Sequence, residues 1–290
     1  LPVRTSLGTD FPVPWIGWIP DFQHRHLPEF FTAEDCRKRD IQFQTLVDEA
    51  THLIVSSEET RRDLHQFYQA PPDKVSVYAF RTASDPDWYA DDPAESAARF
   101  ELPEKFLMFP SQFWKHKNHG LLLEAIRAVK AQGVDDICLV LTGKDLDYRN
   151  PDHPQQIKDL IRDHGLEASI RYLGLLPRRD QMSLMRRAAA IVQPSLFEGW
   201  SMLVEDCRVL GKSILLSDIP VHREQAYAKA AYFDPRDTGS LVALLQDRWP
   251  GLVPGPDTAA EAEAQKENVT LVEQNGRRLR GIFEQALAAG

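Results

Sequence analysis

Short β-rich runs alternate with helical patterns over most of the chain, and this alternation limits the possible folds more than any other feature. Helical periodicity is clear at 119–132, 155–164 and 179–189. Strands that alternate with helices predict parallel α/β sheets. Nine runs have the composition of buried strands: WIGWIP (15–20), HLIVSS (52–57), VSVYAF (75–80), KFLMFP (105–110), ICLVLT (137–142), IRYLGL (170–175), AIVQPS (190–195), SILLSD (213–218) and AAYFDP (230–235).

The alternation is interrupted once, which predicts two α/β units. Residues 81–104 are acidic, contain proline and lack a β-rich run, so we expect a linker there. Residues 1–80 would then be the C-terminal part of one unit, and residues 105–245 a complete second unit. Residues 246–290 begin as a connector rich in proline and glycine and continue as a charged helix predicted over 261–288.

Composition excludes several classes of protein. Of the 290 residues 43% are apolar, which predicts a hydrophobic core. The net charge of −9 argues against wholesale binding to nucleic acid, which needs a strongly basic face. The sequence contains no run of 18 apolar residues, so we expect no transmembrane helix. The three cysteines lie far apart without a CxxC pair, so we expect neither a disulfide framework nor a zinc site, and a cytoplasmic, reducing location.

Ligands of open parallel sheets bind where strands end and helices begin, so we expect the binding residues in the loops at those points. The loop FPSQFWKHKNHG (109–120) places Lys115 and Lys117 just before a helix. A cation beside free helix amides is typical of a phosphate site. A solvated basic turn is the competing interpretation, and on this stretch alone the two are evenly matched.

A second loop, TGKDLDY (142–148), carries Asp145 and Asp147 as a D-x-D pair. Such a pair can hold a divalent cation under a nucleotide diphosphate. Most paired surface aspartates are merely solvated, however, so we expect no metal here.

The third loop opens LFEGWSMLVEDCRVLG (196–211) and combines a carboxylate with a helix start. Ser201 suits a helix N-cap, and Gly199 would let backbone amides approach a ligand closely. Glu198 precedes the helix and could accept hydrogen bonds from sugar hydroxyls. Asp206 or its neighbour Glu205 could hold a ribose; spacing favours Asp206. Interaction with the helix dipole would explain Glu205 well but Glu198 poorly.

Together these segments resemble the retaining family 4 glycosyltransferases, which have the GT-B fold. PSLFEGWSMLVEDCRVLGKSILLSDIPVHREQ is similar to the donor-site signature of that family, a Glu and a second acid eight positions on, here Glu198 and Asp206. FPSQFWKHKNHGLLLEAI resembles its phosphate-binding segment, and IRYLGLLPRRDQMSLMRRAAAIVQPS the stretch between. The second acid is usually Glu, and an Arg usually stands at Gln112, so Lys115 would supply the second charge.

The resemblance covers 105–245 well and 15–80 more weakly, and it implies a fold. That fold is α/β of the GT-B type, with two Rossmann-like units that contain parallel sheets. A complete enzyme of this type has a full N-terminal Rossmann-like domain, so the resemblance implies that the N-terminal unit is incomplete here, by about a hundred residues.

The resemblance also implies an activity: transfer of a sugar with retention, from a nucleotide-sugar donor to a glycan or lipid-linked acceptor, with neither metal nor another cofactor. Charge that develops on the leaving diphosphate would be stabilised by Lys117, Lys115 and the amides around Gly199, Trp200 and Ser201. Glu198 would orient the donor sugar. His24, which follows the run at 15–20, would act near the reacting carbon; it could also be an ordinary loop histidine, and His26 is its competitor.

Two other classes of protein fit parts of the pattern. A non-catalytic module could bind a nucleotide or nucleotide sugar without turnover. A metal-dependent transferase would use the D-x-D pair, but its nucleotide domain lies near the N-terminus.

Lipid-linked acceptors would allow a peripheral membrane contact through the basic doublets, although solvated helix faces are the favoured interpretation. These doublets are Arg61–Arg62, Arg178–Arg179, Arg186–Arg187 and Arg277–Arg278.

Overall fold

The computed structural model describes residues 2–289 and divides into two compact units. The first comprises Leu1–Thr82, Phe197–Met202 and Val269–Gly290, and the second comprises Ala83–Leu196 and Leu203–Asn268. Each unit contains a parallel sheet of its own.

The sheet of the second unit has six parallel strands in the order β6-β5-β4-β7-β8-β9. Counted along the unit, this is the strand order 3-2-1-4-5-6 of dinucleotide-binding folds, in which the order reverses between the two central strands and a ligand binds outside their carboxyl ends. Here the reversal lies between β4 and β7. The strands are β4 (Leu107–Pro110), β5 (Leu139–Thr142), β6 (Ile170–Gly174), β7 (Ala190–Gln193), β8 (Ile214–Ser217) and β9 (Ala230–Phe233).

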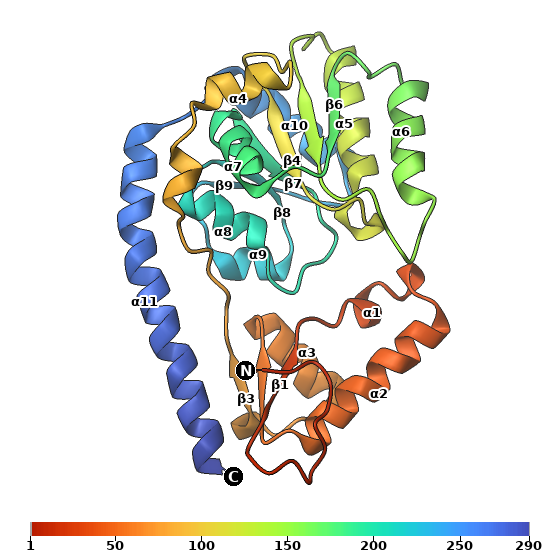
Figure 1. The fold of residues 1–290 in the computed structure, drawn as a ribbon. Coiled ribbons are helices and arrows are strands. Elements are labelled where there is room, and N and C mark those ends of the chain that lie inside the picture. Colours follow the sequence, from red (N-terminus) through yellow and green to blue (C-terminus); the bar gives the residue numbers. More distant parts are fainter. Residues whose placement is uncertain (1, 290) are drawn as a thin grey trace. The chain divides into compact units, whose positions relative to one another are not determined.

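Helices cover both faces of this sheet (Figure 1). On one face α5 packs against α6 and α10. Elsewhere in the unit α4 packs against α7. The right-handed crossovers of parallel strands put α7, α8 and α9 on the face opposite α5. The helices are α4 (Pro93–Arg99), α5 (His119–Ala131), α6 (His153–Asp163), α7 (Arg178–Arg187), α8 (Met202–Val209), α9 (Pro220–Gln225) and α10 (Thr238–Arg248), with short 3₁₀ turns η3 (Pro86–Tyr89), η4 (Lys115–Lys117) and η5 (Trp249–Gly251).

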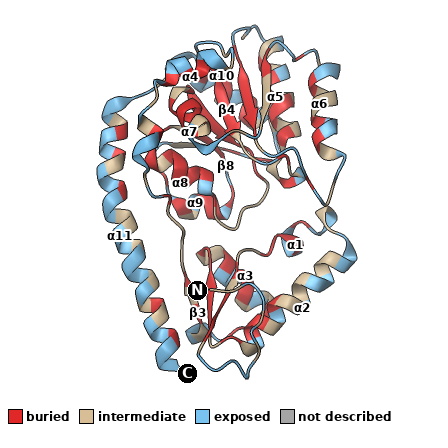
Figure 2. Cartoon of the chain, in the orientation of Figure 1, coloured by how far each residue is buried: buried red, intermediate tan, exposed pale blue. Residues whose placement is uncertain are grey.

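Cover on both faces explains why these strands are apolar without alternation. Phe106, Leu107, Met108 and Phe109 are all inaccessible to solvent, so side chains on both sides of β4 lie in the core. The same burial appears along the neighbouring strands (Figure 2).

The first unit has a three-stranded parallel sheet in the order β1-β2-β3. Its core centres on Ile19, Phe22, Leu46 and Leu53, and a second apolar cluster joins the sheet to the C-terminal helix through Ile282. The elements are β1 (Ile16–Ile19), α1 (Gln23–His26), η1 (Pro28–Phe30), α2 (Ala33–Glu49), β2 (His52–Val55), α3 (Glu58–Tyr68), η2 (Pro72–Lys74), β3 (Val75–Val77) and the last part of α11 (Thr258–Ala289).

All nine predicted strands are present, each within one to three residues of the predicted bounds. The α/β class with parallel sheets is therefore confirmed. Among the residues described, no helix combines the length and apolar character needed to cross a membrane.

The structure differs from the linker predicted at 81–104. From Ala83 on, this segment belongs to the second unit. It forms η3 and α4, and it buries Trp88 and Ala97 in the core of that unit. The acidic residues that suggested a linker instead lie at the starts of these turns, where Asp85 and Asp92 accept hydrogen bonds from backbone amides.

Candidate functional site

Two loops of the second unit meet at the point where the strand order reverses. The amide of Leu196, in the loop after β7, donates to the carbonyl of His116 in the loop after β4, at 2.9 Å. The side chain of Asn118 donates to the carbonyls of Pro194, at 3.1 Å, and Pro235, at 2.9 Å. Lys115 and Lys117 therefore lie in a turn that is fixed at the carboxyl edge of the sheet, directly before α5.

The turn also depends on a residue in the left-handed region. Asn118 has a φ of 62°, which asparagine tolerates better than most side chains. Its side chain does not cap α5, since it serves the two proline carbonyls instead. Asn118 thus shapes the path from η4 into α5 without covering the first amides of that helix.

Asp147 holds this turn in place from the β5 loop. Its wholly buried carboxylate accepts hydrogen bonds from the backbone amides of Lys115, at 3.1 Å, and Arg149, at 3.0 Å. Asp145 instead forms an ion pair with Lys158. The two aspartates of the D-x-D pair thus serve different partners. Across residues 2–289, no group of three or more His, Cys, Asp or Glu side chains is arranged to hold a metal.

Neighbouring aromatic side chains pack the same turn. The guanidinium of Arg149 lies 4.5 Å from the ring of Trp114. His119, the first residue of α5, lies between Phe109 and Phe113, and its burial lowers its pKa to about 3. His119 is therefore neutral and contributes packing rather than charge to the start of α5.

The two acids of α8 face different partners, as expected for residues 100° apart on a helix. Both carboxylate oxygens of Asp206 accept hydrogen bonds from Arg178, at 2.6 and 2.8 Å. Glu205 accepts from Gln225 at 3.0 Å and lies 3.6 Å from the Nε of Arg208. Because Arg178 begins α7 just after the carboxyl end of β6, it ties Asp206 to the edge where ligands bind. A carboxylate oxygen can accept more than one hydrogen bond, so pairing with Arg178 does not by itself prevent a ribose contact.

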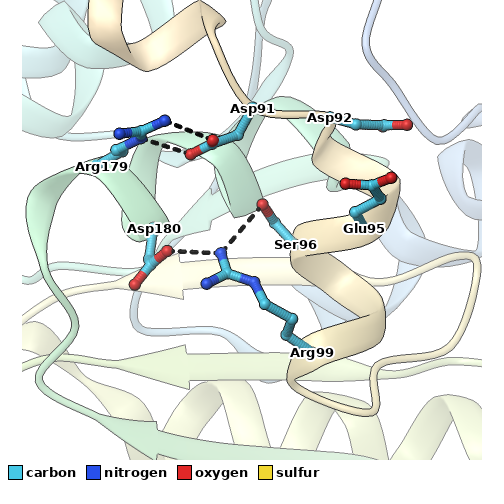
Figure 3. Close-up of a pocket in the computed structure, with 7 residues that line it drawn as sticks. All are labelled: Asp91, Asp92, Glu95, Ser96, Arg99, Arg179 and Asp180. Atoms are coloured by element: carbon cyan, nitrogen blue, oxygen red, sulfur yellow. Dashed lines mark hydrogen bonds and ion pairs between the residues drawn. The ribbon is translucent and has the colours of Figure 1, made fainter.

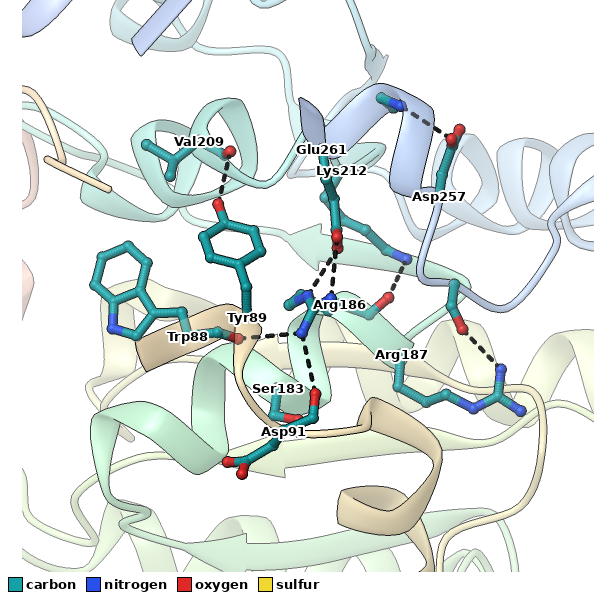
Figure 4. Close-up of polar contacts among 12 residues, drawn as sticks. Trp88, Tyr89, Asp91, Ser183, Arg186, Arg187, Val209, Lys212, Asp257 and Glu261 are labelled. Atoms are coloured by element: carbon teal, nitrogen blue, oxygen red, sulfur yellow. Dashed lines mark hydrogen bonds and ion pairs between the residues drawn. The ribbon is translucent and has the colours of Figure 1, made fainter. Parts of the chain in front are cut away.

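One of two paired arginines that were expected on solvated helix faces is buried. Arg178 pairs with the buried Asp206, as described above, and 43% of its own side chain stays exposed. Arg186 is itself buried, and its guanidinium binds Glu261, at 2.8 and 3.0 Å (Figure 4). The expectation of a solvated face was wrong for Arg186, whose acidic partner lies far away in the sequence.

The loop Phe197–Met202 belongs to the first unit, where it packs on the residues that follow β1. A Cβ on Gly199 would lie 2.4 Å from the carbonyl oxygen of Pro20 and 2.8 Å from the Cβ of Asp21. The indole of Trp200 donates to the carbonyl of Phe80 at 2.9 Å. Gly199 is thus required by close packing against Pro20; the sequence had suggested approach to a ligand.

The structure separates the two candidate histidines. His24 has a wholly buried side chain whose Nε2 lies 2.8 Å from Asp40, and burial lowers its pKa. His26 is partly exposed, its ring lies 5.1 Å from that of Phe197, and a hydrogen bond to Asp63 raises its pKa. His24 is thus enclosed within the first unit, whereas His26 contacts the loop that carries Glu198. The active-site role expected of His24 stays a prediction.

Gly199→Ala should destabilise the first unit by about 1–3 kcal/mol, the usual cost of an added carbon in a packed site. The carbon would meet a backbone oxygen, which cannot move aside like a flexible side chain. Gly276→Ala is the matched control, since its Cβ would meet nothing within 4 Å, and helix α11 should gain about 0.5–1 kcal/mol. Urea unfolding of both variants measures the difference; equal stabilities would contradict the packing role of Gly199.

A separate hollow of about 470 Å³ lies between α4 and α7 (Figure 3). Its two arginines are already paired with acids, Arg179 with Asp91 and Arg99 with Asp180. None of the predicted site residues lines it. With two further acids, Asp92 and Glu95, this hollow is a poor place for an anionic nucleotide.

These features define an α/β protein with a nucleotide-type strand order and a basic turn at its switch point. A family model described as "Glycosyl transferases group 1" matches residues 93–247, more than half of the chain. The chain belongs to this family.

Relatives and solved structures agree with this assignment. The O-antigen chain mannosyltransferase B of Escherichia coli is 22% identical over 87% of this chain and 67% of its own length. The D-inositol 3-phosphate glycosyltransferase of Corynebacterium glutamicum (strain R) is 26% identical over 61% of this chain, which spans only 43% of that relative.

Two solved structures show the fold. Sucrose-phosphate synthase from Thermosynechococcus elongatus has a TM-score of 0.74 at 16% identity, and covers 97% of this chain and 70% of its own. Anabaena HepE in complex with UDP and glucose has a TM-score of 0.71 at 16% identity, and covers 92% and 72%. The GT-B fold class predicted from the sequence is confirmed.

Proposed function

We propose that this protein is a glycosyltransferase that moves a sugar, with retention, from a nucleotide-sugar donor to a glycan or lipid-linked acceptor. The observation that carries the proposal is the turn with Lys115 and Lys117, held by Asp147 at the start of α5 and at the switch point of the sheet. Cations beside helix amides at this position suit a diphosphate.

The names of similar proteins support the same proposal. Relatives are a mannosyltransferase and a D-inositol 3-phosphate glycosyltransferase, and HepE was solved with UDP and with UDP-glucose. A nucleotide sugar is accordingly the donor we propose here.

Each residue of the site has a proposed role. Lys117 and Lys115 neutralise the leaving diphosphate, together with the amides around Trp200 and Ser201. Asp206, oriented by Arg178, binds the ribose of the donor. Glu198 orients the donor sugar.

We propose that the reaction needs neither a metal nor another cofactor. Support comes from Asp147, whose carboxylate is engaged by backbone amides, and from Asp145, which is paired with Lys158. We place the protein in the cytoplasm. Cys36, Cys138 and Cys207 are free thiols in the structure, as suits a reducing compartment. A peripheral membrane contact would follow from a lipid-linked acceptor.

Lys117→Ala should weaken binding of a nucleoside diphosphate by about 1.5–3 kcal/mol, the value of a hydrogen bond to a charged group. Binding of the bare nucleoside should change far less, because the lysine faces the phosphates. Calorimetric titration of UDP, GDP and their nucleosides, with and without excess chelator, measures both effects. Binding should survive the chelator.

The matched control is Lys130→Ala, which removes a lysine from the C-terminal end of α5, the helix that Lys117 precedes. It should leave diphosphate affinity unchanged. Equal losses for diphosphate and nucleoside would contradict the phosphate assignment of Lys117. Binding without turnover or hydrolysis of any sugar nucleotide would favour the non-catalytic binding module.

A further inference from the structure

A chain of contacts in the first unit leads from α3 to the loop that carries Glu198. The Oδ2 of Asp63 lies 2.8 Å from the Nε2 of His26. The imidazole of His26 lies 5.1 Å from the ring of Phe197, with the two planes 31° apart. The side chain of Asp63 is only 7% exposed, so His26 connects a buried carboxylate to the residue just before Glu198.

His26 is also held from a second direction on α3. The ring of Phe67 meets it edge-on, with ring centroids 6.0 Å apart. Because Asp63 and Phe67 lie four residues apart on one helix face, they fix both the position and the tilt of the imidazole. The surface offered to Phe197 is therefore set by α3.

On the C-terminal side of Glu198, other contacts hold the loop in place. Gly199 packs against Pro20, and the indole of Trp200 donates to the carbonyl of Phe80. These are close packing and a neutral hydrogen bond, and neither changes with pH near neutrality. The contact between Phe197 and His26 is the one of the three that includes a group able to titrate there.

We infer that Asp63, His26 and Phe197 form a positioning device that fixes the backbone at Glu198, so that the contribution of the donor sugar to binding depends on His26. The inference rests on the proposed function, in which Glu198 meets that sugar. His26 acts through Phe197 and is a positioning residue.

The charges around His26 give the device a pH dependence. Asp63 and Glu59 of α3 and Asp21 after β1 all favour the imidazolium, and the hydrogen bond to Asp63 raises the pKa of His26 above 6.5. A cation is attracted to an aromatic face such as that of Phe197. The contact is therefore strongest at low pH and weakens as the pH rises above 6.5 through the raised pKa.

The test is calorimetric titration with two pairs of probes, UDP with UDP-glucose and GDP with GDP-mannose, from about pH 6 to about pH 9. The quantity of interest is the ratio of the diphosphate Kd to the sugar-nucleotide Kd in the pair that binds. In the unsubstituted protein this ratio should fall by about two- to fivefold over the range, as expected for one cation–aromatic contact.

Substitutions separate positioning from a structural role. Phe197→Leu should give a low ratio of diphosphate Kd to sugar-nucleotide Kd at every pH. Phe197→Tyr keeps the aromatic ring and should keep the pH dependence of the unsubstituted protein. Asp63→Asn should move the fall to lower pH, because it removes the charge that favours the imidazolium. The matched control is His65→Gln on the same helix, whose Nδ1 lies 2.7 Å from the carbonyl of Ala70; it should keep the original profile.

The outcomes are distinguishable. If Asp63→Asn does not fold, as shown by its unfolding midpoint, the Phe197 pair alone decides the question. A Phe197→Leu protein with the original ratio and profile overturns the inference, while its diphosphate binding leaves the proposed function standing. If the unsubstituted protein binds none of the four probes, the proposed function fails and the inference falls with it.

Discussion

Glu261→Leu should lower the free energy of unfolding of the second unit by about 3–5 kcal/mol, the cost of leaving one partner of a buried ion pair without the other. Glu261 accepts both hydrogen bonds from Arg186, and the exposed fractions of the two side chains are 7% and 6%. The guanidinium also donates to the carbonyls of Trp88 and Asp91, at 3.2 and 3.3 Å. These contacts join α7, the η3 segment and the start of α11 (Figure 4).

Arg186→Met should cost a similar amount, because it leaves the carboxylate of Glu261 buried without a cation. The double variant should lose clearly less than the sum of the two single losses, since no charge is then left unpaired. Urea unfolding of the three proteins measures this coupling.

A control for burial lies two turns away on α7. Arg179 forms a bidentate pair with Asp91, but 52% of its side chain is exposed. Arg179→Met should therefore cost much less than Arg186→Met. Similar losses at the two positions would show that burial does not decide the contribution of these pairs.

The contrast between Arg179 and Arg186 also shows which features a sequence cannot predict. Strands such as β4 were predictable because a strand buried on both faces must be apolar at consecutive positions. The partner of Arg186 lies 75 residues away, and nothing in a local pattern indicates such a pairing. The same limit hid η3 and α4, whose core residues Trp88 and Ala97 lie in an acidic segment without a long apolar run.

In the candidate site, position was easier to predict than purpose. The lysines were placed correctly at a strand end because parallel strands share one carboxyl edge. The spacing of Asp145 and Asp147 is also typical of a metal site, although we expected none, and the sequence did not show their partners, the backbone amides that engage Asp147 and the Lys158 that engages Asp145. Likewise, two histidines two residues apart in a short helix cannot be told apart by sequence, although only His26 contacts Phe197.

The acids of the donor signature should give two different binding phenotypes. Glu198→Gln keeps the shape of the side chain and removes its charge. It should reduce the extra affinity of a sugar nucleotide over its diphosphate, together with turnover, and leave diphosphate binding nearly intact. Asp206→Asn should weaken both ligands alike by about 1–3 kcal/mol, because the ribose and its charge-assisted hydrogen bond are common to both.

The comparison variant is Glu205→Gln, which alters the buried neighbour that binds Gln225. It should change stability more than affinity, because its partners are Gln225 and Arg208. Calorimetric titration of UDP, UDP-glucose, GDP and GDP-mannose against the three variants, with unfolding midpoints recorded separately, resolves the roles. A ribose phenotype in Glu205→Gln would assign the ribose to that acid. Unchanged affinities in all three would mean that these acids serve only α8 and its neighbours, and the proposed donor site would lose its main support.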